Sequence, residues 1–171
     1  ALDFLYAHGW DQTHDGWHFM GDRNGNPQPP PWGAPSAKWS FVQHYALLGP
    51  TAMCEATGRG EDCGWLNRGT SSLEAHLWDA TPGREGYFNN AALDWSNRYE
   101  KWFTPTVDGI TTHVLYAYLI GNGGAERTRL LSLADAMSDR MVANMSAPGV
   151  RFGFPEVYQS DWSIGGDRFG F

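Results

Sequence analysis

Cysteine is scarce in this sequence of 171 residues, which contains only Cys54 and Cys63. Two cysteines are too few for a disulfide framework, and they lack the paired spacing of a structural zinc site. We therefore expect two inert thiols. Because disulfides form mainly in oxidising compartments, this scarcity also favours a cytoplasmic location.

Long apolar runs and concentrated positive charge are missing as well. No stretch approaches the roughly 18 apolar residues of a membrane span, and no basic segment followed by an apolar one opens the sequence, so we expect no membrane contact. The 12 lysines and arginines are scattered among 19 acidic residues, which gives a formal net charge of −7. Such a charge balance disfavours binding to a phosphate backbone, so nucleic acid is not an expected partner.

Common catalytic and cofactor motifs are absent too. The sequence has no Gly-x-Ser-x-Gly and no His-Glu-x-x-His, and its segment GNGGAERT lacks the lysine of a phosphate-binding loop. The residues from Asp22 alternate like a calcium-binding loop, but Pro27 stands where that loop needs glycine. His14 and His18 are four residues apart in a predicted loop and strand, which disfavours a metal site. We expect neither a metal nor another cofactor.

Aromatic residues, in contrast, are abundant. Nine tryptophans, seven tyrosines and nine phenylalanines make up 15% of the chain, whereas only 18% of residues are charged. This balance is unlike that of a disordered chain. A chain of this length can form one domain that buries about 70% of its unfolded surface, and much of the aromatic surface must line a core or a pocket.

Turn and cap signals predict one hairpin and two helices in the first half of the sequence. Asn24-Gly25 is a strong signal for a β-hairpin. Ser36 predicts the start of a helix, which Pro50 should kink or interrupt. Residues 61–80 predict a second helix, antiparallel to the first.

A second pair of helices is predicted downstream. Thr104 as the cap and Pro105 in the first position predict a helix that ends before Gly121. Apolar residues recur at helical spacing through residues 124–145, and Pro148 ends that helix.

Three loops rich in glycine and aromatic residues recur after predicted helices. They occupy residues 9–22, 77–90 and 145–162. A unit of two helices and one hairpin cannot bury its apolar face alone, so this recurrence argues for a stacked or closed array of helical hairpins, with coincidence between three loops as the alternative. In such an array the loops lie at one end, where their aromatic side chains wall a pocket for a small ligand.

Several segments resemble, in consistent order, the N-acylglucosamine 2-epimerase superfamily of sugar 2-epimerases and aldose-ketose isomerases. They are FLYAHGWDQTHDGWHFMGDRNGNP, the helix with Lys38, Gln43 and YALLG, THVLYAYLIGNGG, LLSLADAMSDRMVAN and FGFPEVYQSDW. The resemblance implies an all-α fold, a partial (α/α)6 barrel with short β-hairpins in the loops at one end. It also implies that residues 1–171 are a single domain and an incomplete segment of that barrel, because two later histidine-bearing helices of the family are not present.

The resemblance further implies histidine acid-base catalysis on an open-chain sugar. Epimerisation or isomerisation removes and returns a proton alpha to the carbonyl, and histidine titrates near neutral pH. His113 matches a pocket histidine of the family and is our catalytic candidate, whereas the family's main acid-base pair comes from the two later histidines. From helical periodicity alone, His113 is as well explained as a partly buried histidine that hydrogen-bonds a neighbour.

Six more residues are candidates for contacting the sugar: Trp17, Lys38, Phe41, Gln43, Trp102 and Asp108. Lys38 would neutralise an acid or fix the hairpin, or would simply occupy the first turn of a helix. Phe41 keeps the ring of a pocket tyrosine of the family but lacks its hydroxyl, and Asp108 lies beside Gly109, where the family often has asparagine. Tryptophan can stack on a sugar ring, although it more often belongs to a core. His44 is expected to be a packing or surface residue.

Three functions remain open at this stage. The first is an epimerase or isomerase acting on a small-molecule carbohydrate. The second is an (α/α)-barrel glycoside hydrolase or lyase, which would draw its carboxylate pair from Asp22, Asp79, Asp108 and Glu156. The third is a noncatalytic sugar-binding module of helical repeats. Because half a barrel leaves apolar helix faces uncovered, we also expect aggregation or a homodimer.

Overall fold

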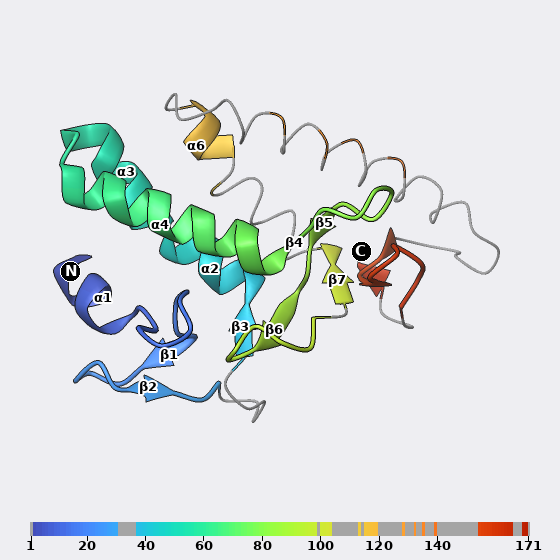
Figure 1. Cartoon of the computed structure of the whole chain (residues 1–171), viewed down its shortest axis with the longest axis horizontal. Helices are drawn as coiled ribbons and strands as arrows, with labels where there is room; N and C mark the ends of the chain where they lie inside the picture. The colour runs from blue at the N-terminus through green and yellow to red at the C-terminus, as the bar shows by residue number, and fades with distance from the viewer. Residues whose placement is uncertain are drawn as a thin grey trace.

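The computed structural model describes residues 2–30, 37–98, 100–103, 113, 115–119, 154–165 and 169–170, with single residues at 128, 132, 135 and 139. Helices and short paired strands alternate along the chain (Figure 1). None of the helices in these ranges has the length and apolar content needed to cross a bilayer.

The helices follow the predicted pattern in the first half of the chain. They are α1 (Leu2–His8), α2 (Ser40–Ala46), α3 (Leu48–Thr57), α4 (Gly60–Leu77) and, further on, α6 (Leu115–Leu119). The interruption predicted at Pro50 is confirmed, because α2 and α3 are separated at Leu47, three residues before the proline that cannot donate a helical hydrogen bond. The predicted helix over residues 61–80 is α4.

The start of the first predicted helix is wrong. Ser36 lies outside the described residues, but residues 37–39 form strand β3, and the helix begins only at Ser40. Lys38 is therefore a strand residue and not part of a first helical turn. Residues 37–39 form a strand instead of a helical turn because their backbone pairs with residues 90–92. This contact is distant in sequence, so helical periodicity does not reveal it.

A tight turn joins α3 to α4, and a disulfide closes it. Gly58 ends α3 in the left-handed conformation, with φ +62, which glycine adopts without steric cost. The turn brings Cys54 and Cys63 together with their Cα atoms 4.8 Å apart, and the two sulfurs are bonded. The expectation of two thiols is therefore wrong. The two cysteines are nine residues apart, and the turn between them reverses the chain and brings their sulfurs together. The expectation of a cytoplasmic location loses its support.

Close contacts fasten α4 to the other helices. The carboxylate of Asp62, in the first turn of α4, accepts hydrogen bonds from Tyr6 of α1 at 2.6 Å and from Arg59 at 2.8 Å. Gly69 allows close packing in the middle of α4, because a Cβ atom at this position would lie 2.4 Å from the side chain of Leu47. These contacts therefore hold α4 against α1 and against the junction between α2 and α3.

In the part of the chain that the structure describes, ten short strands form five antiparallel two-stranded sheets. The pairs are β1 (Met20–Gly21) with β2 (Pro27–Gln28), β3 (Ala37–Trp39) with β6 (Asn90–Ala92), β4 (Trp78–Asp79) with β5 (Gly86–Tyr87), β7 (Glu100–Trp102) with β9 (Val157–Gln159), and β8 (Phe154–Pro155) with β10 (Phe169–Gly170). The first pair is the hairpin predicted at Asn24-Gly25. Because β3 leads directly into α2 and α4 leads directly into β4, these strands lie at one end of the helices (Figure 1).

Of the two helices predicted downstream of residue 103, the structure describes only a part. The helix predicted from Thr104 coincides with the described residues only at position 113 and at α6, and the helix predicted over 124–145 lies outside them apart from single helical residues. The described fold is therefore a set of helices with short strands at one end.

Two copies of the same three-residue contact, which we call clasps, occur in the described residues. The first clasp consists of Asp11, Lys38 and Trp95, and the second consists of Asp79, Lys101 and Trp162. In each clasp, the lysine Nζ lies 2.9 Å from an aspartate oxygen, and both side chains are buried. The lysine also lies over the tryptophan ring, with 5.5 Å to the ring centroid in the first clasp and 5.2 Å in the second.

Each clasp joins three successive pieces of the chain. The aspartate follows a helix, the lysine lies in the strand of the next unit, and the tryptophan belongs to an Asp-Trp-Ser turn of the unit after that. Both tryptophans have a φ of +65. In each turn, the serine hydroxyl donates to the aspartate of the same turn, Asp94 or Asp161, at 2.6 Å. The clasps therefore connect consecutive units at their strand-bearing end.

The disulfide generates a first prediction. Closing this short loop should stabilise the folded protein by about 2–3 kcal/mol through the entropy of the unfolded chain. Replacing both Cys54 and Cys63 with alanine should lower the free energy of unfolding by that amount in urea denaturation. Thiol titration of the native, unreduced protein should find no reactive thiol, and two titratable thiols would contradict the bond.

The second clasp generates another prediction. Lys101→Met leaves the buried carboxylate of Asp79 without its counter-ion, so the free energy of unfolding should fall by about 3–5 kcal/mol. Adding Asp79→Leu should recover much of this loss, because the pair is then replaced by apolar side chains. Urea denaturation measures both changes, and a single variant as stable as the unsubstituted protein would show that the clasp contributes nothing.

Candidate functional site

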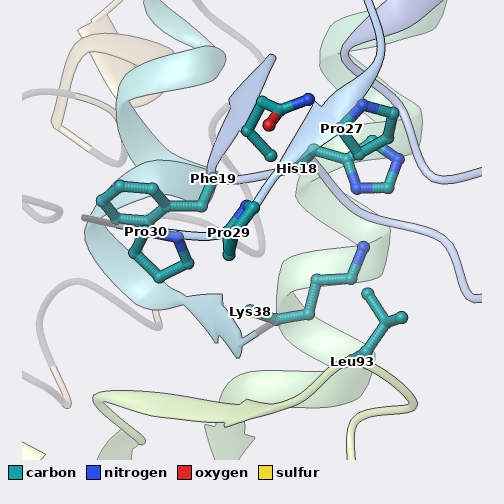
Figure 2. Close-up of a pocket in the computed structure, with 8 residues that line it drawn as sticks. His18, Phe19, Pro27, Pro29, Pro30, Lys38 and Leu93 are labelled. Carbon is teal, nitrogen blue, oxygen red and sulfur yellow. The ribbon is translucent and has the colours of Figure 1, made fainter. Parts of the chain in front are cut away.

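A pocket of about 140 Å³ lies beside the first clasp, at the strand-bearing end of the helices (Figure 2). Its lining residues come from the β1–β2 hairpin, from β3 and from the loop after β6: His18, Phe19, Pro27, Gln28, Pro29, Pro30, Lys38 and Leu93. The hairpin is shaped by Asp22, whose carboxylate accepts hydrogen bonds from the backbone N–H groups of Asn24 and Asn26 at 2.8 and 2.9 Å.

Lys38 supplies the positive charge of this pocket. Its side chain is 1% exposed, and its Nζ donates to Asp11 at 2.9 Å and to the carbonyl of Gly16 at 3.4 Å. Burial raises the pKa of Asp11, but hydrogen bonds from Lys38 and from the backbone N–H groups of Thr13 and His14 outweigh this effect and lower it to about 2. Lys38 therefore neutralises an acid, as one interpretation of the sequence expected, although the acid is not in the hairpin.

His18 is the functional candidate that sequence reasoning missed. The sequence suggested it only as half of a metal pair with His14, and the described residues hold no cluster of potential metal ligands. Burial lowers the pKa of His18, and the charge of Lys38 lowers it further. The imidazole is therefore neutral near pH 7 and able to accept a proton or a hydrogen bond.

Aromatic rings form one wall beside this pocket. Phe19 lines the pocket, and its ring contacts those of Trp39 and Phe41 at centroid distances of 6.4 and 5.9 Å. Phe41 therefore lies behind the lining ring and supports it. Such a wall suits the C–H face of a sugar ring.

Trp17 and Gln43 are joined to each other. The side chain of Gln43 accepts from the backbone N–H of Trp17 at 2.7 Å and donates to its carbonyl at 2.9 Å, and both residues are buried. Neither is among the residues that line the pocket. Together they fix the backbone next to His18, so their place in the described structure is that of support.

Trp102 is not among the residues that line the pocket, and Asp108 is not among the residues that the structure describes. Trp102 is in β7, partly buried, and donates to the Glu100 carboxylate at 2.9 Å. Asp108 lies outside the described residues. Their proposed contact with a ligand stays a prediction.

His113 is buried between α2 and α4. Its Nδ1 lies 3.3 Å from Nδ1 of His44, and its Nε2 lies 3.2 Å from the hydroxyl of Thr70. His44 is fully buried, which confirms its expected packing role. Burial and the neighbouring His113 lower the pKa of His44 well below the usual value of 6.5. One neutral ring therefore donates its N–H to the other.

The structure thus brings only some of the candidates together. Lys38 lies in the pocket and Phe41 lies behind its aromatic wall, whereas His113 belongs to a separate buried pair. His18 and Phe19 complete the pocket. Their position after Gly16-Trp17 in the first aromatic loop was the available signal.

The buried histidine pair generates a prediction about pH. A histidine whose pKa is lowered by folding gives stability that is complete above its unfolded pKa near 6.5 and is lost as the pH falls below it. The free energy of unfolding should therefore decline between pH 7 and pH 5, by up to about 1.4 kcal/mol per pH unit for this group. His44→Asn should flatten that decline in urea denaturation, and an unchanged slope would contradict the assignment.

Comparison with solved structures shows which proteins share this fold. No protein-family profile matches the sequence, and no curated protein is significantly similar to it. A cellobiose 2-epimerase from Spirochaeta thermophila matches 96% of this chain, with a TM-score of 0.77 and 16% identity. A D-mannose isomerase matches 96% with a TM-score of 0.75 and 16% identity, and a cellobiose 2-epimerase from Bacillus thermoamylovorans matches 95% with 0.72 and 13%.

The chain spans about 40% of the length of these solved proteins: 40%, 38% and 41% respectively. The match nevertheless covers nearly all of the present chain. At the level of fold, the resemblance found in the sequence is therefore confirmed, and the chain has the fold of a segment of sugar epimerases and isomerases.

Proposed function

We propose that this chain is part of a carbohydrate epimerase or isomerase. The observation that carries the proposal is the likeness of 96% of the chain to both a cellobiose 2-epimerase and a D-mannose isomerase. Two enzymes with different sugar substrates share this fold, which supports the substrate class rather than one sugar. We further propose that residues 1–171 form one domain and belong to an (α/α)6 barrel.

The proposed reaction begins with removal of the proton alpha to the carbonyl of an open-chain sugar. The proton returns to the same carbon in an epimerase, or to the neighbouring carbon in an aldose-ketose isomerase. His113 is the proposed acid-base residue of this chain, and further histidines of the whole protein would share the work. Neutral His44, 3.3 Å from His113, supports this role because it adds no positive charge that would oppose protonation of His113.

Two of the candidate carboxylates, Asp79 and Asp22, do not favour the alternative of a glycoside hydrolase. A general acid of that chemistry needs a raised pKa. Burial raises the pKa of Asp79, but its bonds to Lys101 and Thr81 lower it below the usual value. Hydrogen bonds from Asn26 and neighbouring backbone groups lower the pKa of Asp22. Both carboxylates are therefore held as anions by structural contacts.

Isotope exchange tests the proposed function. In heavy water, the purified protein should incorporate solvent deuterium at C2 of D-mannose, which proton NMR follows as loss of the C2 signal. His113→Asn should slow this exchange by at least about 100-fold, the usual contribution of a general acid-base group.

A matched control and two contrary outcomes make the test decisive. His8→Asn changes an exposed histidine of α1 and should leave the exchange rate unchanged. Release of reducing ends from cellobiose without exchange would support a glycosidase. Binding of sugars with neither exchange nor cleavage in the full-length protein would support a sugar-binding module instead.

A further inference from the structure

The two clasps differ in how they use the lysine ammonium group. Lys101 donates to the Asp79 carboxylate at 2.9 Å, to the carbonyl of Ser160 at 2.6 Å and to the carbonyl of Arg84. An ammonium group has three N–H donors. All three of them are therefore engaged in the second clasp.

Lys38 has only two acceptors among the residues the structure describes. They are the Asp11 carboxylate at 2.9 Å and the carbonyl of Gly16 at 3.4 Å. The residue that corresponds to Ser160, directly before the Asp-Trp-Ser turn, is Leu93, which instead lines the pocket. The amino end of Lys38 is directed toward the space between His18 and Leu93 (Figure 2). Among the described residues, the third N–H of this buried ammonium therefore has no acceptor at the pocket.

The side chain beside the lysine also differs between the two clasps: it is apolar in the second clasp and polar in the first. In the second clasp, the residue after Tyr87 is Phe88, whose ring centroid lies 5.3 Å from Nζ of Lys101. Trp17 pairs with Trp10 as Tyr87 pairs with Trp78, so the residue that corresponds to Phe88 is His18. Neither ring nitrogen of His18 has a hydrogen-bond partner in the described ranges. An apolar cover in one clasp is thus a polar group in the other.

Apart from the amide of Gln28, the rest of the lining is apolar, and the pocket is small. Phe19, Pro29 and Pro30 supply rings that can contact C–H groups. The pocket has a volume of about 140 Å³. Beside the Gln28 amide, the pocket therefore offers a small ligand the third N–H of Lys38, a ring nitrogen of His18 and an apolar wall.

We propose that the first clasp is a sugar subsite, in which Lys38 donates a hydrogen bond to one oxygen and His18 accepts one from a neighbouring hydroxyl. A vicinal pair of oxygens on a sugar matches this donor and acceptor, and Phe19 contacts the C–H face. The choice of a sugar rests on the proposed function. The second clasp is closed by Phe88 and Ser160 and holds no ligand.

His18→Phe is the most direct test, because it copies the residue found in the second clasp and keeps the ion pair intact. The affinity of the purified protein for D-mannose, measured by isothermal titration calorimetry, should fall by at least about tenfold, the value of one hydrogen bond. The melting temperature should remain near that of the unsubstituted protein. The matched control is Phe88→His, which should leave the affinity unchanged.

Substitution of the two lysines gives a second, independent comparison. Lys38→Met and Lys101→Met each remove one clasp ammonium and should destabilise the protein to a similar extent. Only Lys38→Met should also abolish D-mannose binding, measured at a temperature where both variants remain folded. Equal affinities in the two variants would overturn the proposal.

Failure of the subsite and failure of the proposed function give different results. Isotope exchange at C2 with an unchanged KM in His18→Phe would overturn the subsite and leave the isomerase. A tenfold weaker affinity in His18→Phe, with no exchange in any form of the protein, would support the subsite and remove the isomerase. No D-mannose binding by the unsubstituted protein at millimolar concentrations would overturn the subsite.

Discussion

The buried lysine-aspartate pair is the interaction on which the arrangement of this chain depends. Burial of two charges is costly unless they are paired and their remaining hydrogen-bonding groups are satisfied. In each clasp, the lysine Nζ lies 2.9 Å from the aspartate, backbone carbonyls accept further bonds, and a tryptophan ring covers the lysine. These requirements draw a helix end, a strand and a turn from three successive units to one point, so the strand-bearing end is ordered by electrostatics as well as by apolar packing.

The candidate site follows from an incomplete version of this interaction. At Lys101, where three acceptors are present, the lysine is fully buried. At Lys38, a leucine in the position of Ser160, which accepts no hydrogen bond from the lysine in the described structure, and a histidine in place of phenylalanine stand beside a small pocket lined by polar and apolar groups. A repeated structural device can thus become a binding site by losing one internal acceptor. The scaffold supplies the rigidity that a specific ligand contact needs.

Local signals in the sequence were enough to predict the local structure. The Asn24-Gly25 turn, the interruption near Pro50 and the helix α4 depend on residues close together in the chain, and the order of several segments indicated the fold.

Contacts distant in sequence were not predicted in the same way. Strand β3 forms because it pairs with β6, and the Cys54–Cys63 bond forms because a turn reverses the chain. His18 was overlooked because its neighbour Lys38 is 20 residues away, and only the fold places both at one pocket. The roles assigned to His113 and Asp108 stay predictions.

The central claim is that the unused donor of Lys38 marks where a ligand binds. A crystal structure of the protein grown with D-mannose tests this claim most directly. The account predicts a sugar oxygen within hydrogen-bond distance of Nζ of Lys38, with the bond to Asp11 retained and the second clasp unchanged. An empty pocket in which Lys38 donates to the carbonyl of Leu93, as Lys101 does to Ser160, would contradict it.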